Sequence, residues 1–179
     1  MAATPGVVSG ELIARAREGQ PEALEAIYLE QGDALMRLAY HLTGSATDAE
    51  DVLHDVFLGL PEALARYEER GSFPAWLRRV TARVALDRLR SARRRREVPL
   101  DRAHEPAAAS SERDVAHRSD LERALRTLPD KLRVVFVLKE IDGQSHAEIA
   151  QTLGIRVGTS EVRLHRAITQ LRRQLKEGA

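Results

Sequence analysis

The sequence predicts an all-α protein, built as two small helical domains joined by a flexible linker, with a helix-turn-helix in the second domain. Ala, Leu, Arg and Glu recur through the 179 residues, while aromatic residues make up only 4%, and this composition favours helix over sheet. Apolar residues repeat at intervals of three and four along most of the chain. Residues 97–118 lack this period and are rich in Pro, Ala and Ser, which predicts a linker between domains at 9–96 and 119–177.

Helix start and stop signals divide the first domain. Ser9 is suited to cap a short first helix, and Pro21 fits the first turn of a second helix, which Gly44 ends. Thr47 and Glu50 are expected to form the capping box of a third helix, since each side chain can satisfy a free backbone amide of the first turn. A fourth helix is expected to follow, with apolar residues on one side and arginines on the other.

The second domain ends in a pattern typical of a helix-turn-helix. Ser145 and Glu148 form a capping box ahead of a short helix, Gly154 fits a left-handed turn, and a longer basic helix runs from about Thr159 to Lys176. In such a motif the second helix enters the major groove and offers its early residues to base edges. The alternative is that the arginines only solvate the outside of a helical hairpin.

Seven residues of this motif are the predicted contacts with double-stranded DNA: Arg156, Thr159, Ser160, Glu161, Val162, Arg163 and Arg166. Glu161 could accept a hydrogen bond from a cytosine amino group, and Val162 could contact a thymine methyl group. Arg156 is expected to contact the phosphate backbone without reading sequence.

Charges are segregated along the first domain, although the net charge of the whole chain is only +1. Residues 47–69 are acidic and carry one arginine, whereas residues 78–96 carry nine arginines and one aspartate. The acidic helix suits a basic helical partner, and the arginine helix suits nucleic-acid phosphates. A purely solvated acidic face is the alternative for the first of these. Phe73 and Trp76 could either stack on unpaired bases or belong to the core.

The residue types exclude several other classes of protein. The chain has no cysteine, so disulfides and thiolate metal sites are impossible. The six histidines form no metal-binding motif with carboxylates, and there is no phosphate-binding glycine loop or nucleophile elbow. We therefore expect no enzymatic activity, no metal and no cofactor. Without a signal peptide or an apolar run long enough to span a membrane, the protein is expected to be cytoplasmic, with no membrane insertion.

Motifs from both domains resemble the extracytoplasmic-function group of bacterial sigma factors, in the sigma-70 family. Residues 128–136 and 143–150, together with 157–159 and 163–167, are similar to region four of that family. Residues 48–57 are similar to the core-binding helix of its region two, and residues 73–77 and 87–90 to the promoter-binding end of region two. The two matches occur in the family's order, with a linker between them.

The resemblance implies that region two binds the clamp of the largest catalytic subunit of RNA polymerase and melts the minus-ten promoter element. It implies that region four reads the minus-thirty-five element, that the polymerase flap region is also contacted, and that an anti-sigma factor is a further partner. The expected polymerase-binding residues are Asp48, Glu50, Asp51, Val52, Asp55 and Phe57. The expected minus-ten residues are Phe73, Trp76, Arg79, Arg83, Arg88 and Arg90.

Three positions depart from the family pattern, at two places in the chain. Arg83 stands where many members have an asparagine that helps to select a flipped minus-ten base, and Glu161 and Val162 stand where a basic residue and a serine are common. The promoter sequence therefore cannot be copied from other members. The alternative function is a stand-alone helix-turn-helix regulator, which would bind DNA as a dimer without polymerase.

Overall fold

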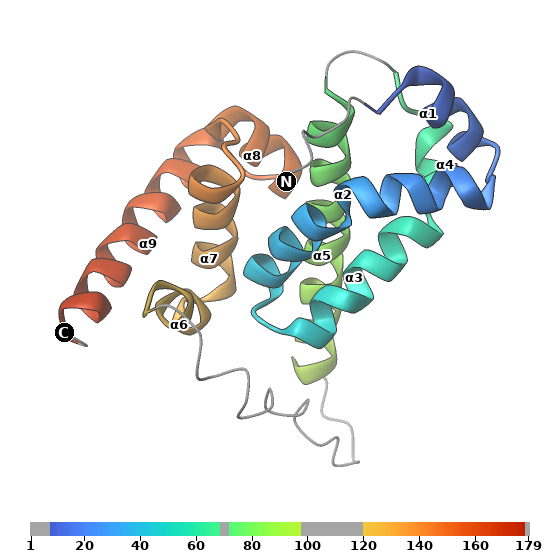
Figure 1. Ribbon diagram of the computed structural model, residues 1–179. Helices are drawn as coiled ribbons and strands as arrows, with labels where there is room; N and C mark the ends of the chain where they lie inside the picture. Colours follow the sequence, from blue (N-terminus) through green and yellow to red (C-terminus); the bar gives the residue numbers. More distant parts are fainter. Residues whose placement is uncertain (1–7, 69–71, 98–119, 178–179) are drawn as a thin grey trace, which may run out of the picture.

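The computed structural model describes residues 8–68, 72–97 and 120–177, and helices joined by short turns make up these segments (Figure 1). No strand occurs within them, which confirms the predicted all-α class. The helices are α1 (Gly10–Arg17), α2 (Pro21–Thr43), α3 (Ala46–Leu58), α4 (Leu60–Leu64), α5 (Phe73–Glu97), α6 (Asp120–Thr127), α7 (Asp130–Phe136), the π-helical turn η2 (Val137–Ile141), α8 (His146–Leu153) and α9 (Val157–Glu177). Most of the expected linker, residues 98–118, lies outside the described residues.

Most of the predicted helix ends are confirmed. Ser9 caps α1 by accepting a hydrogen bond from the backbone amide of Leu12, and Pro21 lies in the first turn of α2. Gly44 ends α2 with a φ of 76°, a left-handed conformation that costs glycine little because it has no Cβ.

The cap of α3 is one prediction that was wrong. Thr47 and Glu50 do not form the capping box, because the helix begins at Ala46. Ser45 is the capping residue, and its hydroxyl accepts a hydrogen bond from the backbone amide of Asp48. The start of the helix is two residues earlier than predicted, since a serine in extended conformation directly follows the Gly44 turn.

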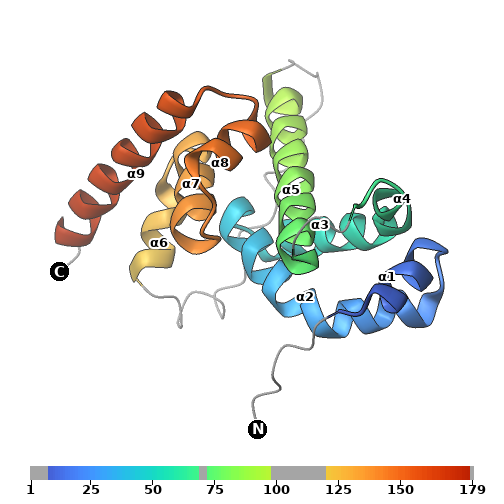
Figure 2. The same cartoon turned by 90° about the horizontal axis from the view of Figure 1, so that it is seen from above.

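The first half of the molecule is built on α2, α3 and α5, with α1 and α4 covering one end (Figure 2). Ile27 and Leu42 of α2, Val52 of α3 and Leu77 of α5 are fully buried between these helices. Burying an aliphatic side chain of this size contributes about 1.5–3 kcal/mol. This core fixes the relative orientation of the acidic helix α3 and the arginine helix α5.

In the second half α7 and η2 form one continuous rod, against which α8 and α9 pack. The backbone amide of Asp142 donates to the carbonyl of Val137, the five-residue step of a π-turn. A smaller cluster, with Leu125, Leu128 and Leu171 at its centre, packs α6 against α9, and Leu132 and Phe136 of α7 border it.

The two halves pack against each other along a seam between α2 and α5 on one side and α7, η2 and α8 on the other. Val135, Leu138 and Ile149 of the second half belong to the same buried cluster as the core of the first. Polar contacts also cross the seam: Arg133, only 5% exposed, donates to the carbonyls of Leu42 (3.1 Å) and Thr43 (3.3 Å) at the end of α2.

A second polar contact crosses the seam between α5 and η2. The guanidinium of Arg78 lies 2.8 Å from the carboxylate of Asp142, whose side chain is only 6% exposed. In this arrangement both predicted DNA-binding helices, α5 and α9, belong to one packed body. Within the described part of the chain no helix is long and apolar enough to cross a membrane.

Candidate nucleic-acid and protein interfaces

Helix α3 presents its acidic residues on the surface. Asp48, Glu50 and Asp51 are exposed, and Asp55 is partly exposed. Val52, by contrast, is fully buried in the core, so its predicted role in binding polymerase is corrected to a packing role. The apolar stripe of α3 has to face α2 and α5, and Val52 lies in that stripe.

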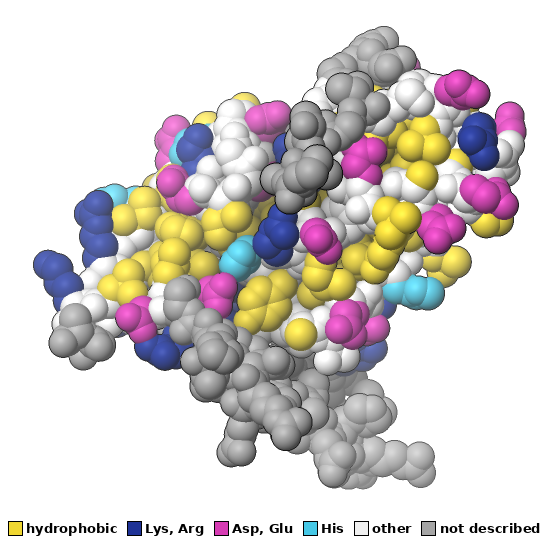
Figure 3. Space-filling model, in the orientation of Figure 1, with side chains coloured by type: hydrophobic (Ala, Val, Ile, Leu, Met, Phe, Trp, Pro, Cys, Tyr) yellow, Lys and Arg dark blue, Asp and Glu magenta, His cyan; other side chains and the backbone are white. Residues whose placement is uncertain are grey.

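Exposed apolar side chains also lie on α2 and α3: Phe57 was predicted at this surface, whereas Tyr28, Leu29 and Leu58 were missed by the sequence reasoning. Phe57 is partly buried against Tyr28 of α2, with ring centroids 5.1 Å apart. Tyr28, Leu29 and Leu58 are 47%, 76% and 73% exposed. Figure 3 shows that hydrophobic side chains gather on the face seen there. Aromatic and apolar side chains at the centre of a polar rim are typical of protein-protein interfaces.

Arg88 of α5 is bonded to two of the acidic residues of α3. Its Nε donates to Asp55 Oδ2 at 2.7 Å, and its Nη1 donates to Asp51 Oδ2 at 2.8 Å. The hydrogen bond to Asp55 is the largest of the effects that raise the pKa of Arg88, and the bond to Asp51 adds to it. The sequence reasoning assigned these residues to two different partners, and the structure brings them together.

The aromatic residues at the start of α5 form a packed trio. Phe73 is 4% exposed and lies between Tyr67 (centroids 5.6 Å apart) and Trp76 (5.7 Å apart). Phe73 is therefore a core residue and does not face DNA, which corrects its assignment to the minus-ten element. Trp76 is only partly buried. Of the two aromatic residues predicted to contact the minus-ten element, it is therefore the one that is still partly exposed.

The other arginines assigned to this element share the side of α5 opposite to Arg88. Arg79, Arg83 and Arg90 are all exposed, and their spacing of four and seven residues brings them onto one stripe of the helix. Arg79 lies 4.0 Å from Glu148 of α8, and Arg90 donates to Asp87 at 3.1 Å and to the Leu153 carbonyl at 3.4 Å. The stripe therefore borders the second half of the molecule.

The helix-turn-helix has the geometry expected from its sequence. Ser145 and Glu148 form the capping box of α8, and the hydrogen bonds from the Ser145 amide and hydroxyl lower the pKa of the Glu148 carboxyl. Gly154 ends α8 with a φ of 64°, and α9 begins at Val157. The turn between the helices is thus short, as a major-groove reading helix requires.

The predicted minus-thirty-five residues do not all face outward. Arg156, Glu161, Val162 and Arg166 are exposed, and Thr159 is partly exposed. Ser160 is fully buried, and its hydroxyl lies 2.9 Å from Nδ1 of His146. Ser160 is therefore corrected from a base-contacting residue to one that joins the start of α9 to the start of α8.

Arg163 turns toward the first half of the molecule. It lines a hollow of about 150 Å³ whose walls include Leu86 and Arg90 of α5 and Leu153 of α8. Arg163 therefore lies at the seam, on the same hollow as Arg90 of α5. Of the predicted contacts on α9, only Glu161, Val162 and Arg166 are exposed rather than partly or fully buried.

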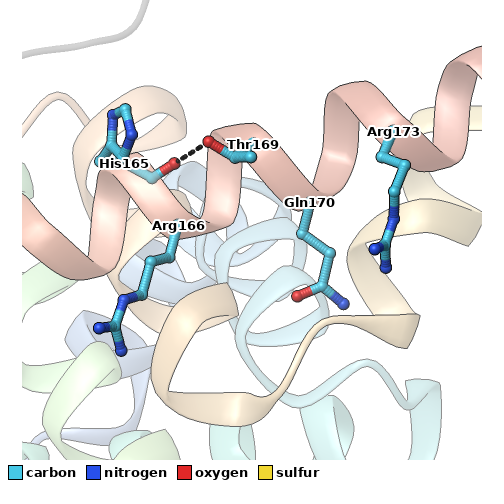
Figure 4. A pocket seen from close by; sticks show the side chains of 5 residues that line it. All are labelled: His165, Arg166, Thr169, Gln170 and Arg173. Carbon is cyan, nitrogen blue, oxygen red and sulfur yellow. Dashed lines mark hydrogen bonds between the residues drawn. The ribbon is translucent and has the colours of Figure 1, made fainter.

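The C-terminal part of α9 carries further basic side chains. Figure 4 shows Arg166, Gln170 and Arg173 extending from the same side of the helix and His165 from the other. The hydroxyl of Thr169 donates a hydrogen bond to the backbone carbonyl of His165 in the same helix, at 2.9 Å. Basic side chains also stand out at the C-terminal end of α9 in Figure 3. Such residues suit phosphate contacts, which position a protein on DNA.

The chain matches two family models in sequence. Residues 27–95 match Sigma-70 region 2, and residues 118–171 match Sigma-70, region 4. The first match covers the first half from within α2 onward, the second covers most of the second half, and the stretch between them, 96–117, is unmatched.

Curated sigma factors are similar over most of the chain. It is 37% identical to the ECF RNA polymerase sigma factor SigE of Mycolicibacterium smegmatis over 80% of this chain, and the match spans 58% of SigE. It is 31% identical to the RNA polymerase sigma factor CarQ of Myxococcus xanthus, over 91% of this chain and 95% of CarQ. With SigW of Bacillus subtilis the identity is 27%, over 92% of this chain and 95% of SigW.

Solved structures show the same architecture. CnrH, in complex with the cytosolic domain of CnrY, aligns with a TM-score of 0.61 and 26% identity, over 96% of this chain and 99% of that one. The sigma factor RpoE of Bartonella quintana, in complex with the anti-sigma factor NepR, aligns with a TM-score of 0.63 and 24% identity, over 85% of this chain and 96% of that one. The second likeness concerns the fold alone.

Proposed function

The chain belongs to the extracytoplasmic-function group of the sigma-70 family, and we propose from this premise that it is a dissociable initiation factor that directs core RNA polymerase to particular promoters. It has no catalytic step of its own. Its work is to bind the polymerase, to hold two promoter elements and to stabilise the melted strand.

The observation that carries this proposal is the presence of three different binding surfaces on one chain. An acidic and apolar surface lies on α2 and α3, an arginine stripe lies on α5, and a helix-turn-helix ends in α9. A stand-alone regulator needs only the last of these. The first two suit a protein partner and a separated DNA strand, which supports the initiation factor over the regulator.

The polymerase-binding surface combines charge with apolar area. Asp48, Glu50 and Asp51 would steer a basic helix of the polymerase clamp toward α3, and charge complementarity of this kind raises the association rate. The exposed Leu58, also on α3, and Leu29 on α2 would supply apolar area that becomes buried on binding, which slows dissociation.

Promoter binding is divided between the two halves. The stripe of Arg79, Arg83 and Arg90 would hold the backbone of the minus-ten strand, and the partly exposed Trp76 would receive an unstacked base. Glu161 and Val162 would read base edges of the minus-thirty-five element. Unstacking costs a few kcal/mol per base step, which contacts to the single strand offset.

The packed arrangement brings the two proposed DNA-binding helices, α5 and α9, into one body. The two elements lie about 25 base pairs apart, which is roughly 85 Å of B-form DNA. Arg90 of α5, however, donates directly to the Leu153 carbonyl of α8. We infer that the halves separate along the seam when both elements are bound.

An anti-sigma factor is a proposed second protein partner. Support comes from a structural relative, CnrH, which was solved in complex with the cytosolic domain of CnrY. A protein that held the seam closed would keep the two promoter-binding surfaces from acting together.

The test of the proposal uses the full chain and purified core polymerase. Gel filtration is expected to show comigration, and transcription from mapped promoters is expected to require both components. Failure to comigrate, together with absence of any promoter-dependent transcript, would defeat the initiation-factor proposal and favour a stand-alone regulator.

A second test separates the two binding activities. Replacing Asp51 and Asp55 with Lys should weaken polymerase binding, because the basic partner would then meet like charge. Binding of duplex promoter DNA by the helix-turn-helix should be unchanged. An equal loss of both activities would contradict the division of labour between α3 and α9.

A further inference from the structure

The bridge between Arg88 and the two carboxylates of α3 has a geometry that bears on partner binding. Arg88 lies on α5, and the side chains of Asp51 and Asp55 are one helical turn apart on α3. The guanidinium reaches both with two different nitrogens, Nη1 at 2.8 Å and Nε at 2.7 Å. One planar group thus holds two acidic side chains in fixed positions.

Arg88 bonds to one oxygen of each carboxylate, so the second oxygen of each remains available to a partner. Both hydrogen bonds are accepted by Oδ2 atoms, and the Oδ1 atoms of Asp51 and Asp55 accept none from the described residues. The side chains of Asp51 and Asp55 are 55% and 40% exposed, so these oxygens are accessible to a partner. A partner helix with two basic side chains one turn apart would match this pair of acceptors.

We propose that Arg88 is a positioning residue of the polymerase-binding surface, which orders the carboxylates of Asp51 and Asp55 as a paired acceptor before the partner arrives. This inference rests on the proposed function of α3. The physical basis is that ordering a flexible side chain on binding costs free energy, and a side chain already held in place avoids that cost. Arg88 therefore increases the affinity for polymerase, although its positive charge offsets one negative charge of the surface.

A simple charge argument gives the opposite expectation. If only net charge mattered, removal of Arg88 would make α3 more negative and would strengthen the attraction of a basic partner. Replacement by lysine would then change nothing, since lysine keeps the charge. The positioning role predicts a loss in both variants, because an ammonium is a point charge and lacks the planar fork that reaches both carboxylates.

The experiment measures the affinity of full-length variants for core polymerase, in the absence of promoter DNA and at several salt concentrations. Arg88→Ala is expected to bind about tenfold more weakly than the wild type, and Arg88→Lys is expected to show most of that loss. Arg66→Ala is the matched control, since it removes an exposed arginine from the same half of the molecule and should stay within about twofold.

A double-mutant cycle separates positioning from a general structural effect. In a chain that already carries Asp51→Asn and Asp55→Asn, Arg88→Ala should cause no further loss, because its acceptors no longer carry charge. Circular dichroism melts would check that each variant is folded, and binding of duplex DNA by α9 should be unchanged.

The possible outcomes are distinguishable. Wild-type affinity or tighter binding for Arg88→Ala, with Arg88→Lys unchanged, overturns the positioning role and leaves the proposed function intact. The positioning role is also overturned if Arg88→Ala weakens polymerase binding as much in the double asparagine variant as in the wild type. Arg88 would then act through residues other than Asp51 and Asp55. Wild-type affinity of the double asparagine variant itself would instead refute the assignment of α3 as the polymerase-binding surface.

Discussion

Replacing Arg133 with alanine should destabilise the seam between the two halves. Its side chain is 5% exposed and donates to the carbonyls of Leu42 and Thr43, the last two residues of α2. Carbonyls at a helix C-terminus have no partner within the helix, so Arg133 satisfies groups that the helix cannot. The ion pair with Asp130 at 2.8 Å adds little, because that carboxylate is 58% exposed.

The magnitude follows from these contacts. A hydrogen bond to a charged group contributes about 1.5–3 kcal/mol, and the two bonds to α2 are made by one guanidinium, so a loss of about 3 kcal/mol is expected. For a chain of 179 residues, each kcal/mol lost from the free energy of unfolding lowers Tm by roughly 2–4 °C. The expected decrease in Tm is therefore about 6–12 °C. A thermal melt followed by circular dichroism measures this decrease.

Lys131→Ala is the matched control, since Lys131 is an exposed cation on the same helix and should change stability by no more than about 0.5 kcal/mol. The chain has no cysteine, so cysteines introduced at the exposed positions Glu25 and Arg172 can carry a single pair of distance labels. The distance distribution should be narrow in the wild type and broader in Arg133→Ala. An Arg133→Ala variant that melts within 2 °C of the wild type, with unchanged distances, would refute the reasoning.

Three other predictions concern single side chains. Ser145→Ala should lower the free energy of unfolding by about 1 kcal/mol in chemical denaturation, because α8 loses its cap; no change would contradict this. Burial lowers the pKa of His41, so the folded state binds fewer protons than the unfolded state. Stability should therefore fall as the pH drops below about 6.5, and melts of His41→Asn should lack this fall. Arg166→Ala should weaken promoter duplex binding by about 1–3 kcal/mol if it makes a bidentate base contact, and a titration of duplexes with single-base changes would locate that base.

Local signals in the sequence were sufficient for most helix ends. Gly44 and Gly154 each end a helix, and Ser145 with Glu148 caps α8, all as predicted; both glycines are left-handed, which was predicted for Gly154 alone. These signals involve neighbouring backbone atoms only, so they do not depend on the rest of the fold. The start of α3 was misplaced because Ser45 and Thr47 are both good caps, and the sequence alone did not separate them.

The direction of individual side chains was harder to predict. Val52, Phe73 and Ser160 were assigned to binding surfaces from their place in a motif, and all three are buried. A motif marks the helix that carries a function, but helices of a small protein bury one face, and which residues lie on that face depends on the packing partner.

Spacing and composition were enough to predict the helical class, the helix-turn-helix, the segregation of acidic and basic helices and the family that the chain resembles. Only the tertiary structure decided that Arg88 pairs with Asp51 and Asp55, that His146 bonds to Ser160 and that Arg133 caps α2. Arg88 and Asp51, and likewise Arg133 and Leu42, lie far apart in the chain, and His146 and Ser160 lie on separate helices. Their meeting is set by how the helices pack, which no local signal encodes.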